Sequence, residues 1–180
     1  MRGKLERQHF EKLLREHSGI VFKVVGMYAR EREEREDLAQ EIHAQCWRSF
    51  ASFDERRAKF STWMYRVALN VAISHGRRRQ RDLASHFEPL ETHHLETIGG
   101  EAPDEADERV AALHAVIAQL DGLNRALILM YLEDRAYAEI AEVLGISETN
   151  VATKINRIKH TLRVRMLGAR AEALDETGSS

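Results

Sequence analysis

The 180-residue chain lacks the features that mark secreted or membrane proteins. It has one cysteine, Cys46, which excludes an internal disulfide. The N-terminal stretch is highly charged and has no apolar core, so we expect no signal peptide. The longest apolar run, residues 19–29, is interrupted by Lys23 and is too short to span a bilayer. These absences predict a cytoplasmic protein without membrane insertion.

Proline is also scarce, and its two occurrences, Pro89 and Pro103, lie in one short region. That region, about residues 82–103, contains a pair of consecutive glycines and no clear apolar period, so we expect a flexible acidic linker. No stretch shows the alternation of apolar and polar residues that is typical of strands. The sequence therefore predicts an all-α chain, in which two small helical domains, residues 1–81 and 104–180, are joined by this linker.

The net charge of −2 hides a segregation of charge along the chain. Residues 1–81 hold 18 bases and 11 acids, residues 82–121 hold one base and ten acids, and residues 122–180 hold eight of each. Attraction to nucleic acid depends on local rather than average charge. The basic N-terminal part is therefore suited to an acidic polymer, and we hypothesise that the acidic linker imitates a phosphate backbone.

Apolar residues at spacings of three and four predict at least three helices in the first domain and four in the second. The expected helices cover about residues 10–30, 36–50 and 61–81, then 104–120, 123–134, 136–144 and 148–167.

The most informative pattern is a helix-turn-helix in residues 136–166. Gly145 permits a left-handed backbone at the end of the first helix, and Ser147 can cap the second helix by accepting hydrogen bonds from its free amides. The apolar residues of the second helix share one face because they lie four, three and four positions apart: Val151, Ile155, Ile158 and Leu162.

The remaining face of that second helix is polar and basic. Between residues 147 and 170, six Lys or Arg residues stand against one acid. Side chains that read base edges and phosphates occur there at helical spacing, and we assign the major-groove contacts to Thr149, Asn150, Thr153, Lys154 and Arg157. An ordinary amphipathic helix with a solvated basic side is the alternative, but such a turn before a polar face is uncommon in plain helix pairs.

The first domain contains two further informative segments. In residues 36–50, one helix face is apolar, while the other carries polar side chains for which simple solvation is one interpretation. Residues 60–81 have apolar groups around most of the helix circumference and end in a run of arginines. A helix with that much apolar surface needs contacts on several sides.

Together these segments resemble bacterial RNA polymerase sigma factors of the extracytoplasmic-function group, which keep only the second and fourth conserved regions. The resemblance rests on D-L-x-Q-E followed by a tryptophan from Asp37 to Trp47, on F-x-x-W-x-x-x-x-A-x-N from Phe60 to Asn70, and on E-I-A-E-x-L-G-I-S from Glu139 to Ser147. The order of these motifs across an acidic linker strengthens the joint signal.

The resemblance implies a subunit that directs core RNA polymerase to promoter DNA. The first domain would open the minus-ten element, and the second would dock on the minus-thirty-five element and on the polymerase flap. Contacts with the clamp helices of the largest polymerase subunit would come from Asp37, Gln40, Glu41, Trp47 and Arg48. Trp47 is equally consistent with a place in the core. Sigma factors of this group are often sequestered by an anti-sigma factor, which is a further expected partner.

Strand opening requires aromatic platforms, small pockets and a positive groove that hold unpaired bases away from the stack. By resemblance, the loop of residues 52–59 would form the pocket for an extruded base. The residues that would contact the minus-ten strand are Lys59, Phe60, Ser61, Tyr65, Arg66, Asn70, Arg77 and Arg78. A solvated helix end is the alternative for the arginines, and we expect Trp63 in the core.

Two other classes of protein were weighed against a sigma factor. An autonomous helix-turn-helix regulator explains the recognition helix equally well, but it does not explain a separate domain with an aromatic, basic helix. An enzyme is disfavoured because His93 and His94 lie in the linker and Cys46 has no partner at ligand spacing. No nucleophile–base arrangement or phosphate-cradling loop is visible. We therefore expect no cofactor, no metal and no small-molecule substrate.

Overall fold

The structure, a computed structural model, describes residues 2–85 and 105–177, and in these residues the regular elements are all helices. This confirms the all-α class. The larger part of the predicted linker, residues 86–103, lies outside the described residues. The helices are α1 (Arg2–Glu16), α2 (Ser18–Tyr28), α3 (Arg32–Phe50), α4 (Phe60–Ser85), α5 (Glu105–Ala118), α6 (Gly122–Leu132), α7 (Tyr137–Leu144) and α8 (Glu148–Thr177).

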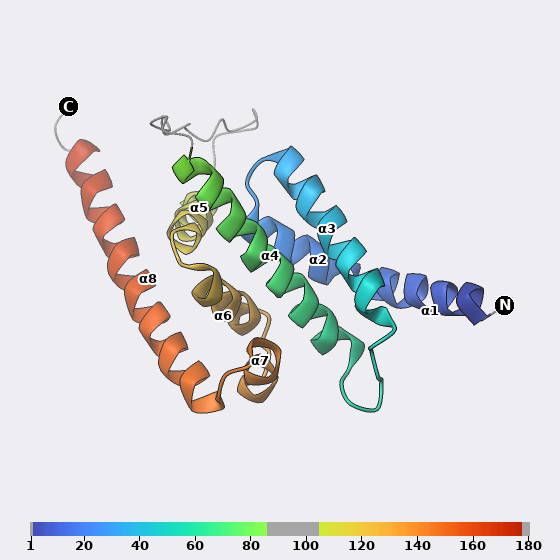
Figure 1. Cartoon of the computed structure of the whole chain (residues 1–180). Helices are drawn as coiled ribbons and strands as arrows, with labels where there is room; N and C mark the ends of the chain where they lie inside the picture. The colour runs from blue at the N-terminus through green and yellow to red at the C-terminus, as the bar shows by residue number, and fades with distance from the viewer. Residues whose placement is uncertain (1, 86–104, 178–180) are drawn as a thin grey trace.

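Helices α2, α3 and α4 pack into the bundle of the first domain (Figure 1). The apolar face predicted for α3 is confirmed, because its residues at spacings of four are all buried: Leu38, Ile42, Cys46 and Phe50. On α4 the buried side chains cover much of the circumference, as its composition predicts, since α4 packs against α2 and α3 on one side and α6 and α7 on the other. Burial of such faces is the main source of stability in a helical domain.

The expected single helix over residues 10–30 is wrong, because the chain breaks between α1 and α2. His17 has φ −116° and ψ 16°, outside helical geometry. Its Nδ1 lies 3.1 Å from the Leu13 carbonyl oxygen, and the Ser18 hydroxyl donates to the Arg15 carbonyl at 3.0 Å. The His17 amide also donates to the Leu13 carbonyl at 3.1 Å, and these bonds close the last turn of α1 before the break. As a result α1 extends away from the bundle (Figure 1), where Phe10 anchors it to α3.

The helix-turn-helix is confirmed in α7 and α8. Gly145 ends α7 in the left-handed region, with φ 68° and ψ 34°, and the Asn150 amide donates to the Ser147 hydroxyl oxygen at 3.2 Å. The four apolar residues predicted for one face of α8 are all buried. Helix α8 continues to Thr177, beyond the expected end near residue 167.

The two helical parts do not stand apart. Helices α6 and α7 lie against α4, and α6 also contacts α2, so the buried apolar residues of both parts form one contiguous core (Figure 1). The sequence predicted two regions separated by a spacer and did not anticipate this contact. None of the described helices combines the length and apolar character that a bilayer crossing needs.

Candidate nucleic-acid interface

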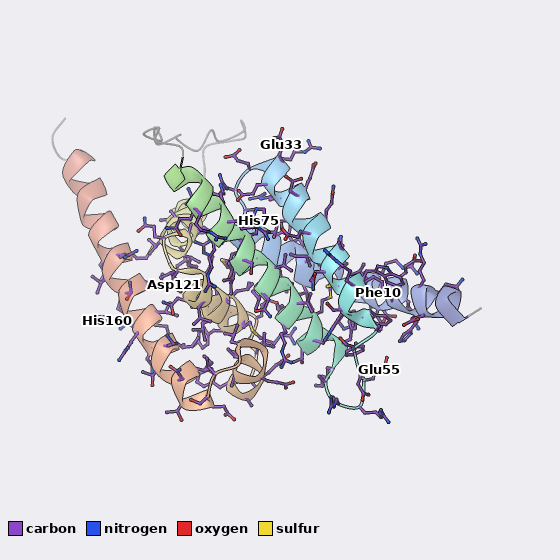
Figure 2. All side chains as sticks on the ribbon, viewed as in Figure 1. Phe10, Glu33, Glu55, His75, Asp121 and His160 are labelled. Carbon is purple, nitrogen blue, oxygen red and sulfur yellow. The ribbon has the colours of Figure 1, made fainter. Side chains whose placement is uncertain are left out.

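The predicted major-groove residues gather near the start of α8, on the side away from the core. Thr149, Asn150, Thr153 and Arg157 are exposed, and Lys154 is half-buried. The Thr153 hydroxyl donates to the Thr149 carbonyl at 2.9 Å, whereas the Asn150 side chain is not used by the cap, which engages its backbone amide. Figure 2 shows His160, one turn beyond Arg157, on the side of α8 that faces away from α6. The arrangement presents donors and a positive charge to a partner.

A second basic surface lies at the C-terminal half of α4. Ser74, Gln80 and three arginines line a shallow, open depression there: Arg77, Arg78 and Arg81. Arginine side chains around a depression suit phosphate oxygens, because the guanidinium donates hydrogen bonds in a planar fork.

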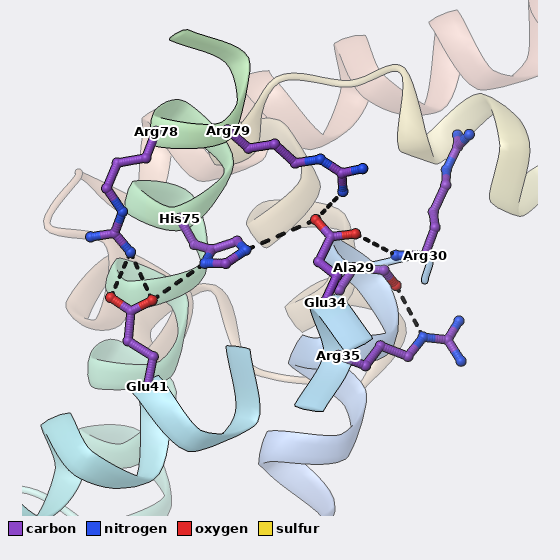
Figure 3. Close-up of polar contacts among 8 residues, drawn as sticks. All are labelled: Ala29, Arg30, Glu34, Arg35, Glu41, His75, Arg78 and Arg79. Carbon is purple, nitrogen blue, oxygen red and sulfur yellow. Dashed lines mark hydrogen bonds and ion pairs between the residues drawn. The ribbon is translucent and has the colours of Figure 1, made fainter. Parts of the chain in front are cut away.

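Part of the arginine run is engaged within the protein, in a cluster that joins α3 to α4 (Figure 3). The Arg78 guanidinium donates to both Glu41 carboxylate oxygens, at 2.6 and 2.7 Å, and Arg79 pairs with Glu34. His75 lies between the two carboxylates, with Nδ1 3.3 Å from Glu41 and Nε2 3.9 Å from Glu34. Arg78 and Arg79 therefore link α4 to α3 through ion pairs.

The charges in this cluster shift both carboxyl groups. Burial opposes ionisation of Glu34, but hydrogen bonds from Arg79 and the Arg30 amide, with the charges of Arg79 and His75, lower its pKa. For Glu41, burial is likewise outweighed by the hydrogen bonds and charges of Arg78 and His75, and its pKa is lowered too. Both carboxylates are thus held in the charged form that the arginines need.

The residues predicted to contact core polymerase lie along one stripe of α3. Asp37, Gln40 and Arg48 are exposed, whereas Glu41 is half-buried because it belongs to the cluster with Arg78. Trp47 is 45% exposed, and its ring centroid lies 5.2 Å from that of Phe10 on α1. Trp47 is therefore a surface residue supported by α1 rather than a core residue.

The predicted minus-ten residues are only partly accessible. Lys59, Arg66 and Asn70 are exposed and Ser61 is half-buried. Tyr65, however, is 0% exposed, and the Arg135 guanidinium lies 5.0 Å from its ring centroid. A role for Tyr65 along a strand path is incompatible with this arrangement, because the second domain covers that face of α4.

Phe60 is also buried, which corrects its expected place in an accessible pocket. It belongs to an aromatic cluster at the start of α4, and its ring centroid lies 5.4 Å from that of Phe53 and 5.2 Å from that of Trp63. Trp63 is half-buried in the same cluster, packed between the predicted pocket loop and the bundle. Phe60 therefore supports the loop from within.

A set of contacts between α4 and α7 was not predicted from the sequence. The Thr62 hydroxyl lies 3.1 Å from the Glu139 carboxylate, and the Arg66 guanidinium donates to the Glu142 carbonyl at 2.7 Å. The signals were a lone buried threonine on an apolar helix face and two acids three residues apart, a spacing that places both on one side of α7. Neither signal identifies its partner, because the two helices are distant in sequence.

The described titratable residues form no cluster of metal ligands. Within residues 2–85 and 105–177, no three His, Cys, Asp or Glu side chains gather as a metal ion would require. Cys46 is buried, and burial raises the pKa of its thiol to about 12, which disfavours at neutral pH the thiolate that reacts or binds metal. The basic and polar surfaces of α4 and α8 remain the candidate functional sites.

Two family models match the chain in the order of its domains: Sigma-70 region 2 over residues 13–82 and Sigma-70, region 4 over residues 111–162. The ECF RNA polymerase sigma factor SigW of Bacillus subtilis is 30% identical over 142 residues, which cover 74% of this chain and 75% of that protein. The chain belongs to the extracytoplasmic-function sigma factors. As a member of this family it directs promoter-specific initiation of transcription.

Other similar sigma factors match both domains. The RNA polymerase sigma-H factor of Pseudomonas aeruginosa is 29% identical over 170 residues, covering 87% of this sigma factor and 86% of that one. The sigma factor RpoE of Bartonella quintana, solved with the anti-sigma factor NepR, has a TM-score of 0.63 at 15% identity and covers 89% of this chain and 95% of its own. CnrH, solved with the cytosolic domain of CnrY, has a TM-score of 0.61 at 21% identity, with coverages of 91% and 90%. These two structures show the same fold.

Proposed function

We propose that this sigma factor reads the minus-thirty-five element with α8 and opens the minus-ten element with α4. The observation that carries the proposal is the exposed face of α8, where Asn150 and Arg157 lie about two helical turns apart beyond a capped turn. An α-helix with such a face fits the major groove, and its amide and guanidinium groups suit base edges and phosphates.

The minus-ten strand would meet the other face of the molecule, along α4. Exposed Lys59, Arg66 and Asn70 lie on or next to this helix, and the basic depression with Arg77 and Arg81 continues toward its C-terminal half. Among the side chains that the structure describes, none with a carboxylate pairs with Arg77 or Arg81, whereas Arg78 and Arg79 pair with Glu41 and Glu34. We therefore assign the upstream phosphate contacts to these two arginines and give Arg78, originally placed with them, a mainly structural role.

Core polymerase would bind the exposed stripe of α3. Asp37, Gln40 and Arg48 offer charges of both signs, and Trp47 adds an apolar surface at the end of the stripe. Charged pairs at the rim of an interface set register and partner choice, and a partly exposed tryptophan is a common anchor. We also propose that the protein works in the cytoplasm with polymerase and that an anti-sigma factor binds it, as NepR binds RpoE of Bartonella quintana.

Transcription with purified components tests the proposal. Wild-type protein and core polymerase are incubated with sheared genomic DNA of the source organism, and transcript starts are mapped. Asn150→Ala and Arg157→Ala should each reduce start-site use by about tenfold, since a lost base-edge contact is worth about 1–3 kcal/mol. Their affinity for core polymerase should be unchanged, and Arg7→Ala on α1 should behave as wild type.

The polymerase contact is tested in the same system. Asp37→Ala combined with Gln40→Ala should weaken core binding by about tenfold, because two interface side chains are truncated together. Unaltered affinity would contradict the assignment of α3. Tight binding of the wild-type protein to duplex DNA, with no association with core polymerase, would instead indicate an autonomous DNA-binding regulator.

A further inference from the structure

Part of the α4 surface that the proposed function assigns to nucleic acid, around Arg66, is in contact with α7 of the second domain. Glu139 and Glu142 project from one side of α7 toward α4. The Glu139 carboxylate accepts a hydrogen bond from Thr62 at 3.1 Å. The Arg66 guanidinium contacts the Glu142 carbonyl at 2.7 Å and its carboxylate at 3.7 Å. The Glu139 carboxylate therefore engages the Thr62 hydroxyl, and Glu142 engages the Arg66 guanidinium through its carbonyl and, at longer range, its carboxylate. Both the hydroxyl and the guanidinium would otherwise suit phosphates.

A second set of contacts joins α6 to the first domain. The Tyr28 hydroxyl donates to the Gly122 carbonyl at 2.6 Å, and Lys23 pairs with Glu133. Gly122 lies so close to α4 that a Cβ atom there would be 3.3 Å from the Ile73 side chain. We call this packing of the second domain against the first the closed arrangement. It combines contacts of acidic residues with a close approach of the Gly122 backbone to the Ile73 side chain.

Buried polar atoms without a hydrogen-bond partner lie at the contact between the domains. Among the described side chains these atoms are the Tyr65 hydroxyl and the Nε of Arg125 and Arg135. Arg135 lies over the Tyr65 ring, and Arg125 lies 5.1 Å from the centroid of Tyr28. Tyr65 is 0% exposed, and this burial raises the pKa of its hydroxyl. A buried polar group without a partner is unfavourable, and opening the contact would hydrate all three.

We propose that α7 is an intramolecular competitor for nucleic acid on α4, in which Glu139 and Glu142 stand where phosphates of the minus-ten strand would bind. The proposal rests on the proposed function, because that function places the strand on this face. Release of α7 would free Arg66 and Thr62 and uncover Tyr65 as an aromatic platform for an unpaired base. In this proposal Tyr65 is buried as long as α7 stays in contact with α4.

The contact is suited to reversible opening. The side chains of Arg66 and Glu142 are about half exposed, so their ion pair is weak and screened by salt. A polyanion that brings several phosphates can replace such an acid, since each neutralised phosphate also releases counterions. We therefore expect α7 to keep single anions away from α4 more effectively than it keeps away a continuous nucleic-acid strand.

Two variants separate the domains by different means. Glu139→Gln with Glu142→Gln removes both charges and keeps the side-chain shape, while Gly122→Gln inserts a side chain against Ile73 without changing any charge. The matched controls are Glu11→Gln with Glu16→Gln on α1, which removes two exposed acids elsewhere, and Gly19→Gln, where a Cβ atom would meet nothing within 4 Å. Circular dichroism verifies that each variant remains helical.

Domain separation is measured by energy transfer between dyes on Glu33→Cys and Val164→Cys, both exposed positions outside the proposed nucleic-acid contacts, since buried Cys46 does not compete for label. Affinity is measured by fluorescence anisotropy with a labelled single-stranded DNA of random sequence. We expect lower transfer and an affinity at least threefold higher in both opening variants, with both controls equal to wild type. Added DNA should also lower the transfer of the wild-type protein.

The outcomes distinguish the competitor from the proposed function. If transfer falls in both opening variants but affinity for the strand stays at the wild-type value, the competitor is refuted. It is also refuted if transfer does not change, because α7 would then not be held by these contacts. If affinity rises as expected but wild-type protein with core polymerase yields no specific start sites, the competitor stands and the proposed function fails.

Discussion

At the scale of single residues, Gly145 decides where α7 ends. Its φ of 68° lies in the left-handed region, which costs a residue with a Cβ atom about 1 kcal/mol or more. We expect Gly145→Ala to lower the free energy of unfolding by about 1 kcal/mol, measured by urea denaturation followed by circular dichroism.

Gly26 provides the control for this substitution. It lies within α2, where its φ is not positive and a Cβ atom would meet nothing within 4 Å. Gly26→Ala should therefore raise the free energy of unfolding by about 0.5 kcal/mol, because alanine favours the helix. Equal effects of the two substitutions would contradict a backbone role for Gly145.

Single residues also mark the limit of prediction from sequence. Ser147 and Gly145 were predictable because capping and left-handed geometry involve neighbours in sequence. Tyr65 was predicted to line the path of the minus-ten strand, yet it is fully buried. It is covered by α7 and by Arg135, in the connection that leads into α7. Thr62 was not singled out, because its partner Glu139 is 77 positions away in sequence.

At the scale of elements, α4 divides its circumference among several neighbours. One side packs on α2 and α3, another on α6 and α7, and the C-terminal half carries the arginine run. Its many apolar residues predicted contacts on several sides, which the structure confirms. The sequence could not show which arginines of the run pair with α3, because Glu34 and Glu41 share the solvent side of that helix with other acids.

The cluster between α3 and α4 predicts a pH dependence of stability. The pKa values of Glu34 and Glu41 are lowered in the folded state, so the unfolded chain binds their protons more readily. Their contribution is present above the ordinary glutamate pKa of about 4.3 and is lost as the pH falls through the lowered values. We expect the free energy of unfolding to decrease over this acidic range, measured by urea denaturation at a series of pH values.

Substitution identifies the source of this dependence. Glu34→Gln should lower the free energy of unfolding at neutral pH by about 1 kcal/mol, because a mostly buried carboxylate with charged hydrogen bonds is lost. Its stability should then vary less with pH than that of the wild type. Glu55→Gln, an exposed acid in the connection before α4, is the control. An identical pH profile in Glu34→Gln and wild type would exclude the cluster as the cause.

At the scale of the whole molecule, the closed arrangement of the two domains predicts a response to salt. The ion pairs Lys23–Glu133 and Arg66–Glu142 are both partly exposed, so salt screens them. The radius of gyration, measured by small-angle X-ray scattering, should increase as sodium chloride is raised from about 0.1 M to about 1 M, where the Debye length falls from about 10 Å to about 3 Å. The Glu139→Gln, Glu142→Gln double variant should already be expanded at low salt. A radius independent of salt in the wild type would argue that apolar contacts alone hold the domains.

The helical class, the helix-turn-helix and the family could all be predicted from the amino-acid sequence, because helix period, capping and motif order are local properties of the chain. The packing of the helices, by contrast, sets which polar side chains face solvent and which are engaged within the protein. Arg66 with Glu142, Arg78 with Glu41 and the burial of Tyr65 are contacts between distant segments. Such contacts depend on how whole helices pack, and a one-dimensional pattern of charge and apolarity does not specify that packing.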